Sequence, residues 1–275
     1  MDRVSCRNLL RSTLAVLPLL LAAAVPIVAE EPKSVRVKVM TFNILHGATT
    51  RGDFDLDRIA AVIRDEDPDL VALQEVDFKT KRAKGYDLAT ELGLRTKMAP
   101  LFGRAMAYDG GEYGEAILSR YSYVTTRVVP LPHGEDSEPR AALEAIVMLP
   151  GGQTIAMVAT HLDHLRDDGD RIAQATKIVD VFAENALPTL LCGDLNAEPT
   201  SRTMEILLNH WSPTWGEEPA PTYPSHAPRT KIDYILVAPS DRWRVVDRRV
   251  IADEVASDHC AYVATLELVD SRQRD

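Results

Sequence analysis

Short polar clusters at the ends of apolar, strand-like segments constrain this chain most strongly. The segments are Val35–Asn43, Leu70–Val76, Thr154–His161, Thr189–Asp194 and Cys260–Leu268, and each begins or ends beside amide, carboxylate or imidazole groups. Polar residues that terminate buried strands are held rigidly and open onto a cleft. The pattern therefore predicts a strand-rich fold whose strand ends carry the chemistry.

Periodicity predicts the remaining elements. Apolar residues at helical spacing predict helices, with a breaker or glycine at the end of some of them. These helices are Asp55–Asp65, Tyr86–Leu92 closed by Gly93, Asp170–Ala186 capped by Asp170, and one near Ser201–Leu208. Further strands are expected at Thr96–Pro100, Glu115–Ser119, Tyr123–Leu131, Ala141–Leu149, Ile232–Val237 and Arg244–Val250. Many strands with a few helices between them predict an α+β fold of two packed sheets covered by helices.

The N-terminus predicts export. Arg3, Arg7 and Arg11 precede an apolar run from Leu14 to Ala29 that two prolines interrupt. A basic start, a short apolar stretch and a small residue at its end are typical of a secretory signal peptide. A retained membrane anchor is the alternative, but a spanning helix needs about 20 uninterrupted apolar residues. We therefore expect cleavage of residues 1–29, a secreted or periplasmic protein with no stable membrane span, and a single domain over residues 30–275.

The net charge limits the kind of partner that the protein can attract, and the cysteine content raises the question of a disulfide. The net charge of the whole chain is −10, and loss of residues 1–29, with three Arg and one Asp, makes it −12. Such a protein should be soluble and weakly attracted to polyanions. Two cysteines then remain, Cys192 and Cys260, each in an apolar strand. An exported pair could form a disulfide, but buried free cysteine is a common core residue, and we expect free thiols.

Two of the polar clusters lie early in the chain. Asn43 follows an apolar strand, where its amide could hold a phosphate oxygen or orient another group, or could simply satisfy a turn. Glu75 stands in an otherwise apolar strand, and a buried carboxylate is costly unless it is paired or bound to metal. An oxygen ligand there suits Mg²⁺, and a salt bridge to an arginine is the alternative.

Two further clusters follow central strands. His161 and His164 flank Asp163, but their spacing at a strand end gives no defined tetrahedral zinc site. A cationic or hydrogen-bonding His161 that clamps a phosphate is the favoured interpretation. In the Gly-Asp-x-Asn segment, Asp194 could deprotonate a water while Asn196 binds developing charge, although such a segment could also be a turn.

The last cluster opens the final strand. Asp258 precedes His259, and Asp233 begins an apolar strand upstream, from which it could orient the imidazole. A serine nucleophile is excluded, because Ser257 lies in no nucleophile elbow and the chain contains no Gly-x-Ser-x-Gly.

Each motif is weak alone, but their order along the chain is specific. The succession Asn, Glu, His, Asp-x-Asn, Asp and Asp-His resembles the endonuclease/exonuclease/phosphatase superfamily, from about Val35 to Leu268. The resemblance implies a four-layer α/β/β/α sandwich of two packed, mostly antiparallel sheets flanked by helices, with the site at one edge of the paired sheets. It also implies a metal-dependent hydrolase of phosphoester bonds.

The resemblance assigns roles to residues. Mg²⁺ or Mn²⁺ would lie on Glu75, with Asn43 and Asp258 in the same metal set, and Asp194 would activate a water. Catalysis would further involve His161, Asn196, Asp233 and His259. Arg140 matches an arginine of small bacterial members that could bind substrate phosphate, together with His164, although it could be an ordinary surface arginine.

Departures from the superfamily pattern narrow the substrate. Abasic-site nucleases of the superfamily carry an Asp two residues after the Asn, where this chain has Leu45. We expect a phosphoester substrate, small or a lipid head group, and a monomeric enzyme; a nucleic acid is possible but not favoured. The alternatives are an extracellular nuclease and an inactive binding protein, although the latter should have lost Glu75, Asp194 or His259.

Overall fold

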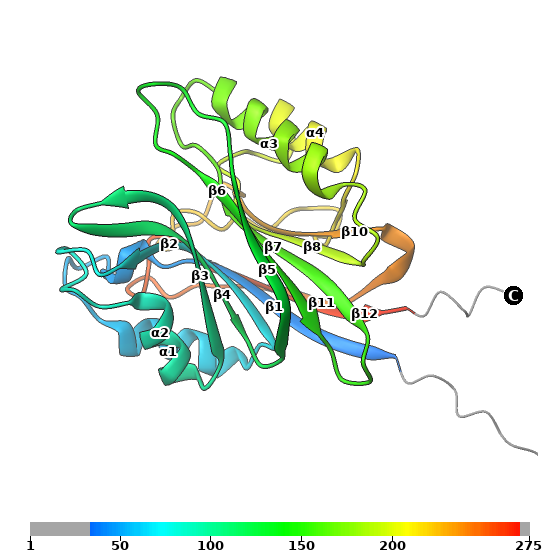
Figure 1. Cartoon of the computed structure of the whole chain (residues 1–275), viewed down its shortest axis with the longest axis horizontal. Coiled ribbons are helices and arrows are strands. Elements are labelled where there is room, and N and C mark those ends of the chain that lie inside the picture. The colour runs from blue at the N-terminus through cyan, green and yellow to red at the C-terminus, as the bar shows by residue number, and fades with distance from the viewer. Residues whose placement is uncertain (1–33, 270–275) are drawn as a thin grey trace, which may run out of the picture. The chain divides into compact units, whose positions relative to one another are not determined.

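Two six-stranded sheets pack face to face in a computed structural model that describes residues 34–269 (Figure 1). The first sheet has the order β11-β12-β1-β2-β4-β3, from β1 (Val35–Asn43), β2 (Leu70–Phe78), β3 (Ala99–Tyr108), β4 (Gly111–Ser119), β11 (Trp243–Ile251) and β12 (Ala261–Leu268). The second has the order β5-β6-β7-β8-β10-β9, from β5 (Ser122–Pro130), β6 (Ala141–Met148), β7 (Thr154–His161), β8 (Thr189–Asp194), β9 (Ser212–Pro213) and β10 (Asp233–Ala238).

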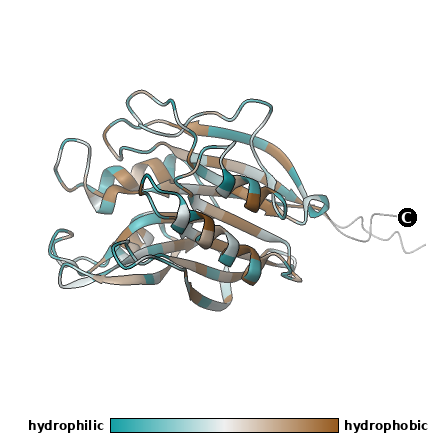
Figure 2. Cartoon of the chain, turned by 90° about the horizontal axis from the view of Figure 1, so that it is seen from above, coloured by the Kyte–Doolittle hydropathy of each residue, from teal (hydrophilic) through white to brown (hydrophobic). Residues whose placement is uncertain are grey.

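Four helices cover the outer faces of the sheets. They are α1 (Leu56–Glu66) and α2 (Leu88–Thr96) on the first sheet, and α3 (Gly169–Phe182) and α4 (Arg202–Leu208) on the second. One apolar cluster fills the space between the sheets, and one lies under each helix pair. Figure 2 shows hydrophobic residues along the strands of both sheets. The predicted four-layer α/β/β/α sandwich is confirmed.

Two parallel strand pairs position the site. β1 pairs with β2, and β7 pairs with β8, while the other named pairs are antiparallel. Helix α1 connects the first pair and α3 the second. Because the carboxyl ends of parallel strands lie at one edge of a sheet, the polar residues after these strands collect at that edge. β10 and β12 run antiparallel to their neighbours β8 and β1, so their first residues arrive at the same edge.

Local contacts explain two corrections to the predicted elements. The strand prediction over Thr96–Pro100 is wrong at its start, because α2 continues through Gly93 to Thr96 and ends at Lys97 in a left-handed conformation. Gly93 serves packing instead of termination, since a Cβ there would lie 2.8 Å from the Met98 carbonyl oxygen. The predicted N-cap of α3, Asp170, is also wrong. The N-cap position is occupied by Asp168, and Asp170 lies in the first turn of the helix.

A long hairpin was only partly predicted. β3 and β4 pair along their whole length, so the strand at Glu115–Ser119 extends back to Gly111. Cys192 and Cys260 are buried free thiols, as expected. None of the helices within residues 34–269 has the length and apolar character that a membrane crossing requires. The signal-peptide prediction lies outside the described residues.

Candidate active site

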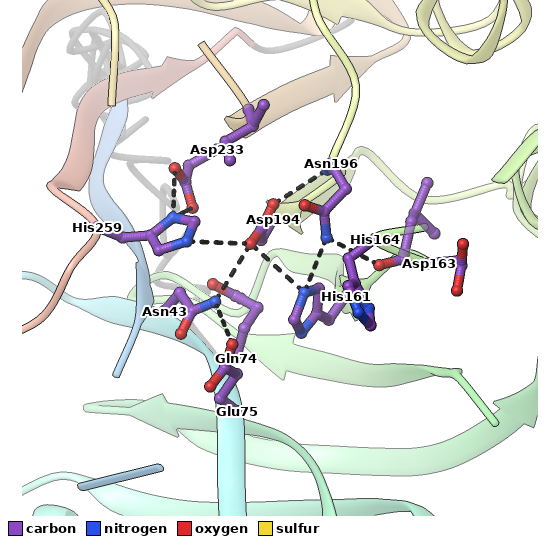
Figure 3. A network of polar contacts seen from close by, with 12 residues as sticks. Asn43, Gln74, Glu75, His161, Asp163, His164, Asp194, Asn196, Asp233 and His259 are labelled. Carbon is purple, nitrogen blue, oxygen red and sulfur yellow. Dashed lines mark hydrogen bonds and ion pairs between the residues drawn. The ribbon is translucent and has the colours of Figure 1, made fainter. Parts of the chain in front are cut away.

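The strand ends bring the predicted site residues together (Figure 3). β7 and β8 align His161 with Asp194, and β8 and β10 align Asp194 with Asp233. Gly193 makes the close pairing possible, because a Cβ there would lie 1.9 Å from the Thr160 carbonyl oxygen. Residues that are more than 200 positions apart in sequence also meet, since Ser257 Oγ donates to the carbonyl oxygen of Asn43 at 2.7 Å.

Glu75 reaches the cleft through an irregularity in β2. The pairing of β2 with β4 shifts register between Leu73 and Val76, and Glu75 has a φ of 58°. A positive φ is unusual for a non-glycine residue and re-aims the side chain, as bulges beside active sites do. The side chain is 23% exposed, so the carboxylate that the sequence suggested was buried in the strand opens into the cleft instead.

The surroundings of Glu75 favour its ionised form. Asn43 Nδ2 donates to Oε1 at 3.1 Å, and His46 Nδ1 lies 3.3 Å from Oε2. Burial by itself would raise the pKa of Glu75, but the hydrogen-bonding contacts with His46 and Asn43 outweigh it and lower the pKa to about 2. This carboxylate is therefore suited to bind a cation.

Asn43 connects the two halves of the site. Its Nδ2 also donates to Asp194 Oδ2 at 3.2 Å, and its Oδ1 accepts the Leu45 backbone N–H at 3.1 Å. The amide group is fully buried. Asn43 is therefore placed to orient both Glu75 and Asp194, and its place in the metal set stays a prediction.

Asp233, His259 and Asp194 form a buried row. His259 Nδ1 lies 3.1 Å from Asp233 Oδ2, and its Nε2 lies 3.6 Å from Asp194 Oδ2. Burial alone would lower the pKa of His259, but the two carboxylates outweigh it and raise the pKa to about 10. Burial also raises the pKa of Asp194. The row therefore holds an imidazolium between two acidic groups, with Asp233 fixing the orientation of the ring.

His161 lies between Arg140 and Asp194. Arg140 Nη1 donates to His161 Nδ1 at 3.1 Å, and His161 Nε2 lies 3.4 Å from Asp194 Oδ2. Burial and the positive charge of Arg140 lower the pKa of His161 well below its ordinary value. The cationic alternative for His161 is therefore disfavoured, and the ring acts as a neutral hydrogen-bonding group.

Arg140 is a buried residue of the site and not a surface arginine. Only 2% of it is exposed. Its guanidinium contacts three partners besides His161: His164 Nδ1 at 3.2 Å, Glu138 Oε2 at 3.0 Å and the Tyr113 hydroxyl at 3.5 Å. His164 and Glu138 are open to solvent, so an anion that entered the cleft could replace Glu138 on the guanidinium.

Asn196 has the geometry of an oriented amide. Its backbone N–H donates to Asp194 Oδ1 at 3.0 Å, and its φ is 48°. Asn196 Nδ2 donates to the Leu162 carbonyl oxygen and lies 3.0 Å from His161 Nε2. The side chain is partly exposed and faces the cleft.

A cleft of about 440 Å³ joins these groups, a size suited to a small ligand. Besides Glu75, His161, His164, Asp194, Asn196, Asp258, His259 and Arg140, it is lined by residues that the sequence did not single out: His46, Arg82, Met106, Tyr108, Tyr113, Glu138, Tyr223 and Ile232. Asn43 and Asp233 lie behind this lining and act on the groups that reach it. Most of the added residues come from the β3–β4 hairpin and from loops, whose placement no local motif signals.

Two positions could hold a divalent metal ion. Asp194, Asp233 and His259 offer ligand atoms within 4.8 Å of one another. However, both ring nitrogens of His259 face carboxylates, so none has a free lone pair directed to the cleft. Glu75 and Asp258 instead present two carboxylates to the same cleft, and hard oxygen ligands are what Mg²⁺ prefers. Burial, together with the charge of Glu75, raises the pKa of Asp258, a repulsion that a cation would relieve.

Comparisons with known proteins agree with this geometry. The model of the Endonuclease/Exonuclease/phosphatase family matches residues 40–259. A crystal structure of an endonuclease/exonuclease/phosphatase from Beutenbergia cavernae is 27% identical, with a TM-score of 0.73 over 85% of this chain and 72% of that chain. No curated protein sequence matches the chain.

More distant structures share the fold. A mannosyl-6-phosphatase of Bacteroides thetaiotaomicron is 20% identical, with a TM-score of 0.69 over 84% of this chain and 99% of that chain. The catalytic domain of human Nocturnin, solved with a bound sulfate anion, is 18% identical, with a TM-score of 0.67 over 85% of this chain and 95% of that chain.

Proposed function

Since the chain belongs to the endonuclease/exonuclease/phosphatase family, we propose that it is a secreted, divalent-metal-dependent phosphodiesterase of small or lipid head-group substrates. The observation that carries the proposal is the contiguous network of hydrogen bonds and ion pairs from Glu75 through Asn43 and Asp194 to His259 and Asp233. An inactive binding protein has no need to keep such a network of buried charged groups, which is costly to assemble.

The chain's own residues would bind and orient the phosphoester. Arg140 offers a buried guanidinium, and the neutral ring of His161 and the amide of Asn196 lie beside it at the cleft wall. Hydrogen-bonding groups of this kind, the planar guanidinium above all, suit the non-bridging oxygens of a phosphate. His164, which is exposed beside Arg140, would contact the part of the substrate nearest to solvent.

Asp194 and His259 would act on the attacking water and the developing charge. The Asp194 carboxyl lies within 3.6 Å of three proton-bearing side chains, Asn43, His161 and His259. A carboxylate so placed can orient a water or receive its proton. The imidazolium of His259, held by Asp233, would stabilise the negative charge that develops on the phosphoryl oxygens nearest to the ring.

Mg²⁺ or Mn²⁺ would be held by Glu75 with Asp258, and it would neutralise phosphoryl oxygens and the leaving group. Asn43 fixes the Glu75 carboxylate through its Nδ2. We propose the Glu75–Asp258 position over the group of Asp194, Asp233 and His259, since both ring nitrogens of His259 face carboxylates and so offer no lone pair to a metal.

A substrate panel tests the proposal. The mature chain should hydrolyse bis-p-nitrophenyl phosphate faster than p-nitrophenyl phosphate in Mg²⁺ buffer, and sphingomyelin and inositol phosphates extend the panel. Plasmid DNA should be nicked weakly even at low salt, because the net charge of −12 on the mature chain opposes a polyanion. Efficient nicking that falls steeply with salt would favour the alternative, an extracellular nuclease. Absence of turnover on every substrate would favour a binding protein.

A further inference from the structure

A second guanidinium group faces the cleft, and the proposed hydrolysis does not use it. Arg82 lies in the loop between β2 and α2, and its side chain is 30% exposed. It lines the same cleft as Arg140 and also a neighbouring hollow, whose lining includes His46, Phe54 and Lys84.

Buried groups hold the Arg82 side chain in one orientation. Its Nε donates to Asp77 Oδ2 at 2.7 Å, and its Nη2 donates to Asp77 Oδ1 at 2.8 Å. Asp77 is fully buried and also accepts from Thr80 Oγ1 at 2.6 Å. Paired contacts of this kind fix the plane of a guanidinium. Its Nη1 donates no hydrogen bond to any residue in the described range 34–269, so one edge of the group remains available.

Two tyrosines complete this arrangement. The Arg82 guanidinium lies over the Tyr108 ring at 4.5 Å and over the Tyr113 ring at 5.5 Å from their centroids. The hydroxyl of Tyr113 is 3.5 Å from Arg140 Nη1. One tyrosine side chain therefore separates the two guanidinium groups, and both line one cleft. This spacing suits two anionic groups carried by one small molecule.

We propose that Arg82 forms a second anion subsite that takes a second phosphate group of the same substrate. The inference rests on the proposed function, in which Arg140 binds the phosphoester that is hydrolysed. The Asp77 carboxylate cancels most of the formal charge of Arg82. The subsite therefore recognises an anion mainly through directed hydrogen bonds from the guanidinium, and less through long-range electrostatic attraction. Planar donor edges recognise phosphate oxygens well. Lys84, whose Nζ lies 4.8 Å from the Phe54 ring centroid, supplies a further cation in the neighbouring hollow.

The test compares two ligands that differ by one phosphate. Adenosine 5′-phosphate and adenosine 3′,5′-bisphosphate are used as competitive inhibitors of bis-p-nitrophenyl phosphate hydrolysis. The wild-type chain should bind the bisphosphate more tightly. Arg82→Gln should reduce this advantage about 10-fold, the loss of one charge-assisted hydrogen bond. Arg82→Lys should lose part of it, and this variant keeps the test open if the glutamine variant fails to fold.

Arg104→Gln is the matched control. Arg104 lies in β3, its side chain is 54% exposed, it pairs with Glu112, and it does not line the cleft. The control should keep the full preference for the bisphosphate. If Arg82 only anchors its loop, Arg82→Gln will weaken both ligands equally, and that result would overturn the proposal.

Two further experiments distinguish a nucleic-acid phosphate from a small-molecule phosphate, and a failure of the Arg82 subsite from a failure of the proposed hydrolysis. Trinucleotide and dinucleotide substrates differ by one backbone phosphate, so an Arg82-dependent gain for the trinucleotide would assign the subsite to nucleic acid. A gain for the bisphosphate alone would assign it to small molecules, and no gain in either pair would overturn the subsite. If the wild-type chain hydrolyses no phosphoester, the proposed function fails, and calorimetric binding of the two adenosine ligands still tests Arg82.

Discussion

A buried carboxyl group without a hydrogen-bond partner should make the stability of this protein fall with pH. Glu115 lies in β4 and is fully buried, and neither carboxyl oxygen has a partner among the described residues. Burial raises its pKa from an ordinary value of 4.5 to about 8, against the opposing charge of Arg140. The folded chain therefore keeps the proton of Glu115 at a pH at which the unfolded chain has lost it.

The sign and size of the effect follow from linkage. Between pH 4.5 and about 8 unfolding releases this proton, so the free energy of unfolding decreases as pH rises and levels off above about 8. Each pH unit of the shift corresponds to about 1.4 kcal/mol, so the full loss is on the order of 5 kcal/mol. Glu115→Gln removes the titration and keeps the shape of the side chain. Its stability relative to the wild-type chain should therefore increase across this window.

Urea unfolding at a series of pH values measures the difference. The gap between Glu115→Gln and the wild-type chain should widen by several kcal/mol between pH 5 and 8, on the order given by the linkage relation. Glu112→Gln is the matched control, since Glu112 lies on the same strand, has a side chain 33% exposed and pairs with Arg104. It should change stability by less than about 1 kcal/mol and leave the pH profile in place. Parallel profiles for Glu115→Gln and wild type would refute the reasoning.

Three further predictions test the site and its export. Activity should vanish with EDTA and return with Mg²⁺ or Mn²⁺, and Glu75→Gln should raise the metal concentration for half-maximal activity while leaving the melting temperature unchanged; full turnover in metal-free buffer would contradict this. Asp194→Asn and His259→Ala should each lower kcat by roughly 10³-fold or more, with the double variant little worse, and multiplicative losses would show that they serve separate steps. Mass spectrometry of protein from the native host should find a mature N-terminus near Glu30, and a full-length species would contradict cleavage.

The layers and the central strands could be predicted because their signals are local. Valine occupies every second position at Val35, Val37 and Val39 of strand β1, and apolar residues recur at helical spacing in α1. The spacing of apolar residues within each segment is therefore enough to predict its secondary structure. The β3–β4 hairpin lacks such a signal. Gly103 in β3 meets the Leu143 side chain of the facing sheet, and Gly114 meets the Gly103 backbone. Both positions require glycine because another part of the fold approaches the backbone closely there. The hydrophobic pattern of the segment itself does not indicate such long-range contacts.

The candidate site likewise has features that the sequence predicted and features that depend on long-range contacts. Residues that end strands, such as Asp194 and His161, were predicted from position alone, and the structure places them in contact. The electrostatic state of His161 was not predictable, because it depends on Arg140, which reaches it from the loop that precedes β6. The re-aimed carboxylate of Glu75 depends on a bulge against β4 that leaves no trace in the sequence. Arg82 ends no strand and belongs to no motif, so the sequence did not single it out.

The distribution of charge within the cleft limits the substrate more strongly than net charge does. Both guanidinium groups of the cleft are already paired with a carboxylate, Arg82 with Asp77 and Arg140 with Glu138. A duplex backbone needs a row of cations that are free to release its counterions, and paired arginines offer little of this. A compact phosphoester can instead displace the exposed Glu138 and use the fixed geometry of Arg140. The acidic pair of Glu75 and Asp258 would repel the same phosphate without a cation beside it, so metal and substrate should each strengthen the binding of the other.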